Sequence, residues 1–155
     1  MSTRNSGLSR SDFMDAALAE AEAAGGRGEV PVGAVIVQAG KIVARAGNRT
    51  RELPDATAHA EMTVIRDASR LLSAERLGGC DLYVTLEPCA MCAGAISFAR
   101  IRRLYFGASD AKGGAVVNGV RFFASPTCHH SPDIYAGIGE IQSSELLKRF
   151  FRDRR

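Results

Sequence analysis

The chain has 155 residues, of which 46% are hydrophobic and 24% charged, and its formal net charge is +3. These values are ordinary for one soluble globular domain, and this net charge alone is too small to indicate a nucleic-acid partner. No apolar run approaches the roughly 20 residues of a membrane-spanning helix, and the N-terminus lacks the apolar core of a secretory signal. We therefore expect a cytoplasmic protein that does not bind membranes.

The N-terminal part of the chain predicts a leader followed by a helix. We expect residues 1–8 to be flexible and residues 9–155 to form a single domain. Ser9 and Asp12 have the spacing of a capping box, which marks a helix start, and Gly25-Gly26 is a typical helix end. Between them, four residues at helical spacing form an apolar face: Phe13, Ala17, Ala21 and Ala24.

Short apolar segments predict the first two strands and a second helix. Residues 32–37 are continuously apolar, and Ala39-Gly40 makes a turn into residues 41–46, so the two segments are expected to pair as a hairpin. After a polar loop that contains Pro54, residues 58–72 carry a helical pattern.

The next segments continue this alternation. Residues 82–86 predict a buried strand, and Pro88 directly after it fits the first turn of a helix over residues 88–99. A strand over residues 101–107 follows. Residues 108–133 are rich in Gly, Ser and Pro and are expected to be largely irregular.

The C-terminal part predicts a last strand over residues 134–138 and a closing helix over residues 143–154. Four side chains of that helix are expected to face inward: Leu146, Leu147, Phe150 and Phe151. Helices that alternate with short apolar strands favour an α/β fold, with helices on both faces of one sheet.

Two short segments carry the chemistry of the chain. His59-Ala60-Glu61 and Pro88-Cys89-Ala90-Met91-Cys92 together supply three zinc ligands and one carboxylate. Structural zinc sites usually have four protein ligands, whereas catalytic sites have three and leave the fourth position to water. Zinc lowers the pKa of that water from about 15.7 to about 7. The motifs therefore indicate a hydrolytic metalloenzyme in which Glu61 carries protons.

The predicted helices set a geometric condition on this site. Cys89 and Cys92 are three residues apart in a first helical turn, so they share a face. His59 and Glu61 are two apart, and residues at that spacing point to nearly opposite sides of a regular helix. Glu61 can serve the metal only if His59 lies at or just before the helix start, and we predict that it does.

Other interpretations of the cysteines and histidines stay open. Cys-x-x-Cys after a strand is also typical of a dithiol redox site, which would leave the His-x-Glu motif without a role. A structural zinc site, for example in an RNA-binding module, needs a fourth ligand. Cys128, His129 and His130 could offer one, but they are expected to be ordinary loop residues. Cys80 is expected in the core.

Basic residues gather in two places, and one of them is the C-terminus. Arg100, Arg102 and Arg103 form the first cluster; the second comprises Lys148, Arg149, Arg152, Arg154 and Arg155. Such clusters can bind phosphates, but cations also favour helix C-termini for purely local reasons. Charge alone favours the local explanation.

The two motifs resemble the signature of the zinc-dependent nucleobase and nucleoside deaminases of the cytidine/deoxycytidylate deaminase superfamily. Over about residues 9–155, longer segments resemble the bacterial tRNA-specific adenosine deaminases. These segments are Pro31–Val35, Asn48-Arg49, Thr57–Glu61, Leu82–Ile96, Tyr105–Ala115 and Glu145–Arg152.

The resemblance implies a fold, a cofactor and a reaction. The fold would be a three-layer α/β/α sandwich around a mixed sheet of about five strands, assembled as a homodimer. One Zn²⁺ per chain would be held by His59, Cys89 and Cys92, with Glu61 as general acid and base. The reaction would be hydrolytic deamination of adenosine to inosine at the wobble position of a tRNA anticodon. The alternative is a deaminase of a free nucleobase or nucleoside such as cytosine, cytidine or guanine.

The resemblance also implies substrate contacts. Val32 would lie against the base, and Asn48 would hydrogen-bond the flipped nucleotide. The remaining residues that match positions near the anticodon stem-loop are Ala58, Asp110, Lys112, Phe150, Phe151 and Arg152.

Overall fold

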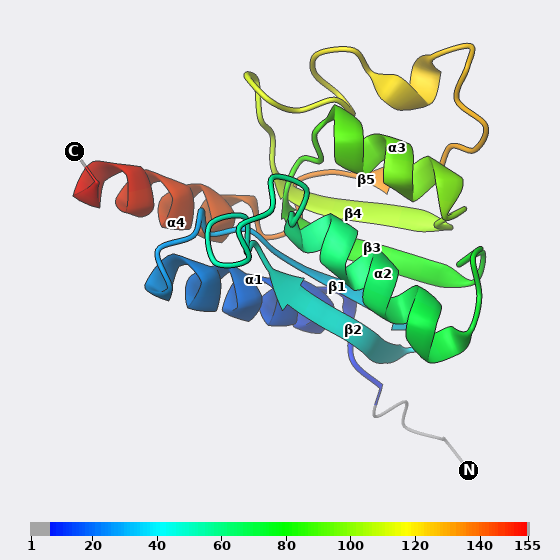
Figure 1. Cartoon of the computed structure of the whole chain (residues 1–155), viewed down its shortest axis with the longest axis horizontal. Coiled ribbons are helices and arrows are strands. Elements are labelled where there is room, and N and C mark those ends of the chain that lie inside the picture. The colour runs from blue at the N-terminus through cyan, green and yellow to red at the C-terminus, as the bar shows by residue number, and fades with distance from the viewer. Residues whose placement is uncertain (1–6, 155) are drawn as a thin grey trace.

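The computed structural model describes residues 7–154 (Figure 1). Its strands are β1 (Gly33–Gln38), β2 (Lys41–Gly47), β3 (Cys80–Leu86), β4 (Arg103–Ala108) and β5 (Asp133–Tyr135). They form one sheet in the order β2-β1-β3-β4-β5. β1 pairs antiparallel with both β2 and β3, whereas β3, β4 and β5 are parallel. The sheet is therefore mixed, as the resemblance implies.

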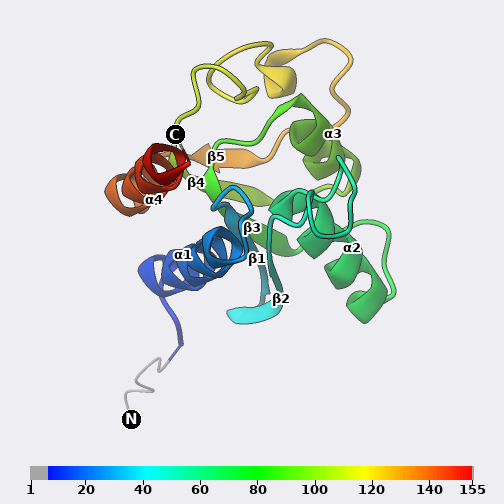
Figure 2. The same cartoon turned by 60° about the vertical axis from the view of Figure 1, so that its left-hand side comes forward.

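Helices cover both faces of this sheet. They are α1 (Arg10–Gly26), α2 (Ala60–Leu72), α3 (Ala90–Phe98) and α4 (Glu140–Asp153), with a short 3-10 turn η1 at Phe122–Ala124. α1 and α4 lie together on one face, and α2 and α3 lie on the other (Figure 2). This arrangement is the expected three-layer α/β/α sandwich. Within residues 7–154, no helix is long and apolar enough to cross a bilayer.

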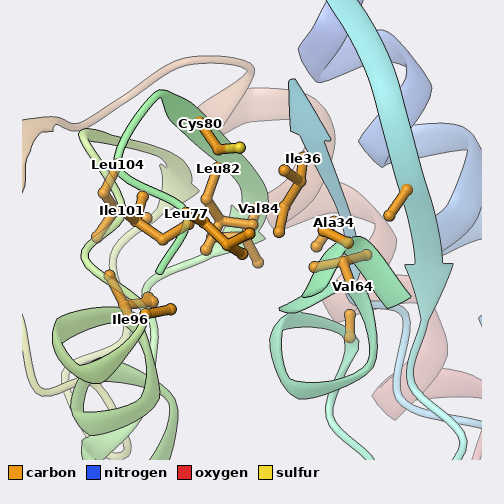
Figure 3. Close-up of a cluster of buried hydrophobic side chains, with 14 of the residues drawn as sticks. Ala34, Ile36, Val64, Leu77, Cys80, Leu82, Val84, Ile96, Ile101 and Leu104 are labelled. Atoms are coloured by element: carbon orange, nitrogen blue, oxygen red, sulfur yellow. The ribbon is translucent and has the colours of Figure 1, made fainter. Parts of the chain in front are cut away.

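The strands are buried on both faces because their side chains alternate between two apolar clusters. Alternate residues of β1, β3 and β4 pack against α2 and α3 (Figure 3), among them Ala34, Ile36, Leu82, Val84 and Leu104. Their neighbours pack toward α1, including Val35, Val37, Tyr83 and Tyr105. Nearly continuous apolar strands therefore stabilise both layers.

Helix α1 approaches β1 so closely that only glycine fits at the start of the strand. A Cβ atom at Gly33 would lie 2.0 Å from the carbonyl oxygen of Ala17 and 2.4 Å from the backbone nitrogen of Ala21. The Gly33 N–H donates to Thr85 Oγ1 on the neighbouring strand. The close packing of α1 and this hydrogen bond together fix the start of β1. They therefore also fix the position of the segment just before β1, which leads toward the candidate site.

The structure confirms most predicted elements and corrects some of their limits. The Ser9–Asp12 capping box and the β1–β2 hairpin are present. Helix α4 begins three residues earlier than predicted, and β5 has only three residues. Phe151 was expected inside but is 51% exposed. Of the predicted leader, residues 1–6 lie outside the described part of the chain.

Candidate metal centre and active site

The three predicted metal ligands come together at the starts of two helices. His59 Nδ1 lies 3.7 Å from Cys89 Sγ and 3.5 Å from Cys92 Sγ. All three ligand atoms lie within 4.8 Å of one another. His59 and Cys89 are partly buried, and Cys92 is fully buried. The imidazole thus presents Nδ1, and not Nε2, to both sulfurs.

Both helix starts have the same local structure. His59 is the N-cap of α2 and Cys89 is the N-cap of α3, each with an extended backbone and without a side-chain capping bond. The prediction that His59 precedes the first helical turn is therefore confirmed. Pro88 was expected inside the first turn of the second helix, but it precedes the N-cap. Cys89 consequently lies at the N-cap and Cys92 in the first turn.

The two cysteines interact strongly. A hydrogen bond from the Cys92 thiol lowers the pKa of Cys89 to about 4, against the effect of burial. The same bond and burial raise the pKa of Cys92. The hydrogen bond between His59 and Cys89 raises the pKa of His59, although burial acts in the opposite direction. Two helix N-termini add partial positive charge, which favours thiolates.

This donor set fits zinc. Zinc bonds of about 2.0–2.1 Å to nitrogen and about 2.3 Å to sulfur, at tetrahedral angles, separate a nitrogen from a sulfur ligand by about 3.5–3.6 Å. The separations of His59 Nδ1 from Cys89 Sγ and Cys92 Sγ, 3.7 and 3.5 Å, agree with this value. In the described part of the chain, no fourth His, Cys, Asp or Glu joins the group. Three protein ligands are the pattern of a catalytic site.

The other cysteine and histidine cluster lies elsewhere. The Cys128 thiol donates to the His130 carbonyl at 3.1 Å and lies 3.5 Å from Ser97 Oγ. His130 Nε2 lies 2.7 Å from the carbonyl oxygen of Ile101, and the His129 carbonyl accepts from Arg100. These contacts attach a loop to the C-terminal end of α3, in keeping with the prediction of ordinary loop residues.

Glu61 lies in the first turn of α2 with its carboxylate next to the three predicted metal ligands. Its side chain is only 4% exposed. Burial raises the pKa of Glu61 to about 6, and the carboxylate also interacts with His59, Cys89 and Cys92. A buried carboxylate beside the ligands can accept and return a proton without leaving the site.

Of the residues expected around the base, Asn48 contacts the start of α2, Ala58 directly precedes its N-cap, and Val32 accepts from the Asn48 N–H. Asn48 is 9% exposed, its Oδ1 accepts from the N–H of Ala60 at 2.9 Å, and its Nδ2 donates to the Val30 carbonyl at 3.2 Å. Asn48 therefore caps α2 in place of the His59 side chain. Val32 is 5% exposed, and the Ala58 carbonyl accepts from the Arg49 N–H at 3.0 Å.

Three of the expected RNA-contact residues line one groove of about 920 Å³: Asp110, Lys112 and Phe151. Phe150 lies apart from it, partly buried, with the Arg154 guanidinium 4.3 Å from its ring centre. Arg152 is exposed on α4, and Arg155 lies outside the described residues. The structure thus brings a subset of these residues together.

Two buried glutamates were not predicted from the sequence. Glu29 is 1% exposed and accepts hydrogen bonds from the 50–52 segment, whereas Glu87 is 2% exposed and accepts from the 110–118 segment. Each acid stands beside an apolar segment, which is a weak signal of a buried carboxylate. Arg27 lies two residues before Glu29 and helps to lower its pKa, whereas no basic residue stands close to Glu87 in the sequence.

The model of the cytidine and deoxycytidylate deaminase zinc-binding region matches residues 8–108. The chain belongs to this deaminase family. A tRNA-specific adenosine deaminase of Agrobacterium fabrum is 65% identical over 146 residues, which cover 94% of this chain and 96% of that relative.

Solved structures of the deaminase family agree with this assignment. A structure from work on A-to-I editing by tRNA:A34 deaminases at the wobble position is 66% identical, with a TM-score of 0.88 over 89% of this chain and 100% of its own. The guanine deaminase of Bacillus subtilis is 31% identical, with a TM-score of 0.66 over 92% of this chain and 94% of its own. Deaminases of RNA and of free bases thus share the fold.

Proposed function

We propose that this deaminase hydrolyses the 6-amino group of adenosine at the wobble position of a tRNA anticodon, giving inosine and ammonia. The observation that carries the proposal is the placement of Glu61 beside His59, Cys89 and Cys92 in a chain so similar to the Agrobacterium tRNA-specific adenosine deaminase. Cytidine and guanine deaminases use related sites, so the substrate is inferred from identity along the whole chain.

One zinc ion per chain would be held by His59 Nδ1 and the sulfurs of Cys89 and Cys92. Zinc lowers the pKa of water from about 15.7 to about 7, and so makes hydroxide available as the nucleophile. Glu61 takes a proton from the attacking water and passes it to N1 of the adenine ring as oxygen bonds to C6. Glu61 then moves the hydroxyl proton to the amino nitrogen, the C6–N bond breaks, and ammonia leaves with a carbonyl at C6.

The remaining residues would bind the RNA. Val32 and Ala58 would contact the base and Asn48 the flipped nucleotide, while Asp110 and Lys112 would contact the neighbouring nucleotides. From α4, the proposed contacts are Phe150, Phe151 and Arg152. Anticodon bases are already unpaired, so extruding one costs less than extracting a base from a duplex.

The experiment that tests this function offers the zinc-loaded protein a tRNA with adenosine at the first anticodon position. We expect inosine at that position by mass spectrometry and one ammonia per inosine. Guanine, cytosine and cytidine are offered in parallel. Rapid ammonia release from a free base, without inosine in the tRNA, would instead support the second candidate function, which the likeness to the Bacillus guanine deaminase favours.

We also infer a cytoplasmic homodimer. The cytoplasmic location follows from the tRNA substrate. The dimer is implied by the family resemblance, and it is supported by apolar side chains exposed on the α2–α3 layer, notably Phe98 at 72% and Leu71 at 68%. Large apolar side chains exposed to solvent can mark an interaction surface.

A further inference from the structure

One buried carboxylate outside the catalytic group holds a whole loop. Glu87 follows directly after β3 and is 2% exposed. Its Oε1 accepts hydrogen bonds from the Asp110 N–H at 3.0 Å and from Asn118 Nδ2 at 2.6 Å. Its Oε2 accepts from the backbone N–H groups of Val116, Val117 and Asn118 at 3.0, 2.9 and 3.0 Å. Five donors of one loop therefore converge on one side chain.

The loop backbone closes around this carboxylate. A Cβ atom at Gly114 would lie 2.4 Å from Glu87 Cδ and 2.5 Å from the Asp110 carbonyl oxygen, so a larger residue does not fit. The Gly114 N–H donates to that same carbonyl, and the Ala115 N–H donates to the carbonyl of Pro88, both at 2.9 Å. The path of the loop between positions 110 and 118 thus depends on Glu87.

The outer part of the same loop forms a wall of the groove described above. Residues 109–113 line it opposite Leu147, Phe151 and Arg154. Within this wall, Asp110 Oδ1 accepts from the N–H groups of Lys112 and Gly113 at 3.1 and 2.9 Å. The inner part of the loop is anchored on the carboxylate while the outer part faces the groove.

We propose that Glu87 is a positioning residue that fixes the 109–118 loop as a wall of the substrate groove and thereby sets the affinity for the anticodon loop. The identity of the ligand rests on the proposed function. Without the carboxylate, buried N–H groups lose their acceptors, which is costly. The RNA must then order the loop as it binds, and that requirement weakens the apparent affinity.

The contacts suggest a pair of variants that damage and restore one interaction. Glu87→Gln preserves the shape of the side chain, but its amide NH2 group replaces one of the two accepting oxygens. Because both oxygens accept from N–H groups, the NH2 group faces N–H donors in either orientation of the amide. Asn118→Asp places a second carboxylate against the first. In the double variant, the new amide at position 87 can donate to the new carboxylate at position 118 while its oxygen keeps the three backbone donors. The Asp110 N–H still lacks its acceptor, so recovery is expected to be partial. Glu22→Gln, on an exposed part of α1, is the charge-matched control.

Three measurements are made on the zinc-loaded proteins: zinc content, steady-state deamination of an anticodon stem-loop, and amide hydrogen exchange in residues 110–118. For Glu87→Gln and Asn118→Asp we expect KM to rise about tenfold or more, since buried donors lose their acceptor. We expect kcat to stay within about threefold, unchanged zinc content, and faster exchange at positions 116–118. The double variant should reverse part of the increase in KM and part of the increase in amide exchange. Glu22→Gln should match the wild type.

Unchanged KM and exchange in both single variants would overturn the proposal. The proposal would also be overturned if the single variants lost zinc or kcat and the double variant did not recover them. That result would mean that Glu87 supports Cys89 instead of the loop. If Glu87→Gln does not fold, Asn118→Ala removes one donor only, and an unchanged KM there would overturn the proposal as well. Exchange is measured without RNA, so it tests Glu87 separately from the substrate: wild-type protein that makes no inosine contradicts the proposed function alone.

Discussion

At the scale of single residues, the site depends on where α2 begins. Residues two apart diverge on a regular helix, yet His59 and Glu61 serve one centre because His59 is an N-cap with extended backbone. Glu61 is then a buried acid that interacts with His59, Cys89 and Cys92, and its burial raises its pKa to about 6. Position and burial together suit it to carry a proton in both directions.

Replacing Glu61 with Gln tests this role directly. The substitution keeps the shape of the side chain but removes the group that accepts the proton. General acid–base transfer contributes about 10²–10⁴-fold to rate, so we expect kcat to fall by a factor in that range. Zinc content, measured by atomic emission, should stay at the wild-type value. A variant that keeps full turnover would contradict the assignment, and a protein that binds RNA without catalysis would not change at all.

The zinc content of cysteine variants distinguishes the cysteines that bind the metal from those that do not. Cys92→Ser removes one of the three predicted zinc ligands, and we expect the purified protein to lose most of its zinc and its deaminase activity. Cys128→Ser changes a thiol that bonds only to loop and helix atoms, and we expect full zinc content and activity. Thiol titration accompanies both measurements. Zinc loss in Cys128→Ser would show that the 128–130 loop takes part in the centre, against the geometry.

At the scale of elements, the sequence predicts what is local and misses what is distant. The capping box, the hairpin and the ligand spacing are local patterns, and the structure contains them. The roles of Asn48 and Glu87 depend on contacts with Ala60 and with Asn118, segments that only the folded sheet brings near. No periodicity encodes such contacts.

Helix α4 shows how an amphipathic pattern can mislead. Its apolar residues predict a buried face that includes Phe150 and Phe151, but Phe151 is 51% exposed and lines the groove. A pattern marks which side chains are apolar, and it does not say whether protein or substrate covers them. An exposed aromatic side chain beside basic residues is suited to stack on an unpaired base.

The basic end of α4 gives a prediction about salt. Arg154 lines the groove and Arg152 is exposed, so both are placed to contact phosphates. If Arg152→Gln and Arg154→Gln each remove one contact, the slope of log K against log salt should become less steep by about 0.7 to 0.9 per contact. Stem-loop binding by fluorescence anisotropy at several salt concentrations measures it. Arg70→Gln, on the opposite layer, should leave the slope unchanged; equal slopes in all variants would mean that the α4 arginines only solvate the helix end.

At the scale of the whole molecule, Glu29 makes the stability of the fold depend on pH. Burial would raise its pKa, but hydrogen bonds from Arg51, Glu52 and Thr50 outweigh burial and hold the pKa below the ordinary value of 4.5. The unfolded chain therefore binds the proton first as the pH falls. The stabilisation by Glu29 is present above about pH 4.5 and is lost as the pH falls through the lower folded-state pKa.

We accordingly expect Glu29→Gln to lower the melting temperature near neutral pH and to lose that difference in acid. Thermal unfolding followed by circular dichroism, from about pH 7 to about pH 3, measures both. Glu22→Gln serves again as the exposed control and should follow the wild type throughout. A deficit in Glu29→Gln that is the same at every pH would mean that the residue stabilises the loop by shape rather than by charge.

The proposed homodimer gives the last prediction. Phe98 and Ile141 are both 72% exposed, but Phe98 ends α3 on the layer that carries the metal centre, whereas Ile141 begins α4 on the opposite layer. A stable interface buries about 1,200–2,000 Å² with an apolar centre, and a charge placed there is strongly unfavourable. We expect Phe98→Glu to shift the mass in sedimentation equilibrium from two chains to one, while Ile141→Glu leaves it at two. The three predicted zinc ligands of each site come from one chain, so the monomer should retain zinc. A dimer that persists in Phe98→Glu would place the interface away from the end of α3.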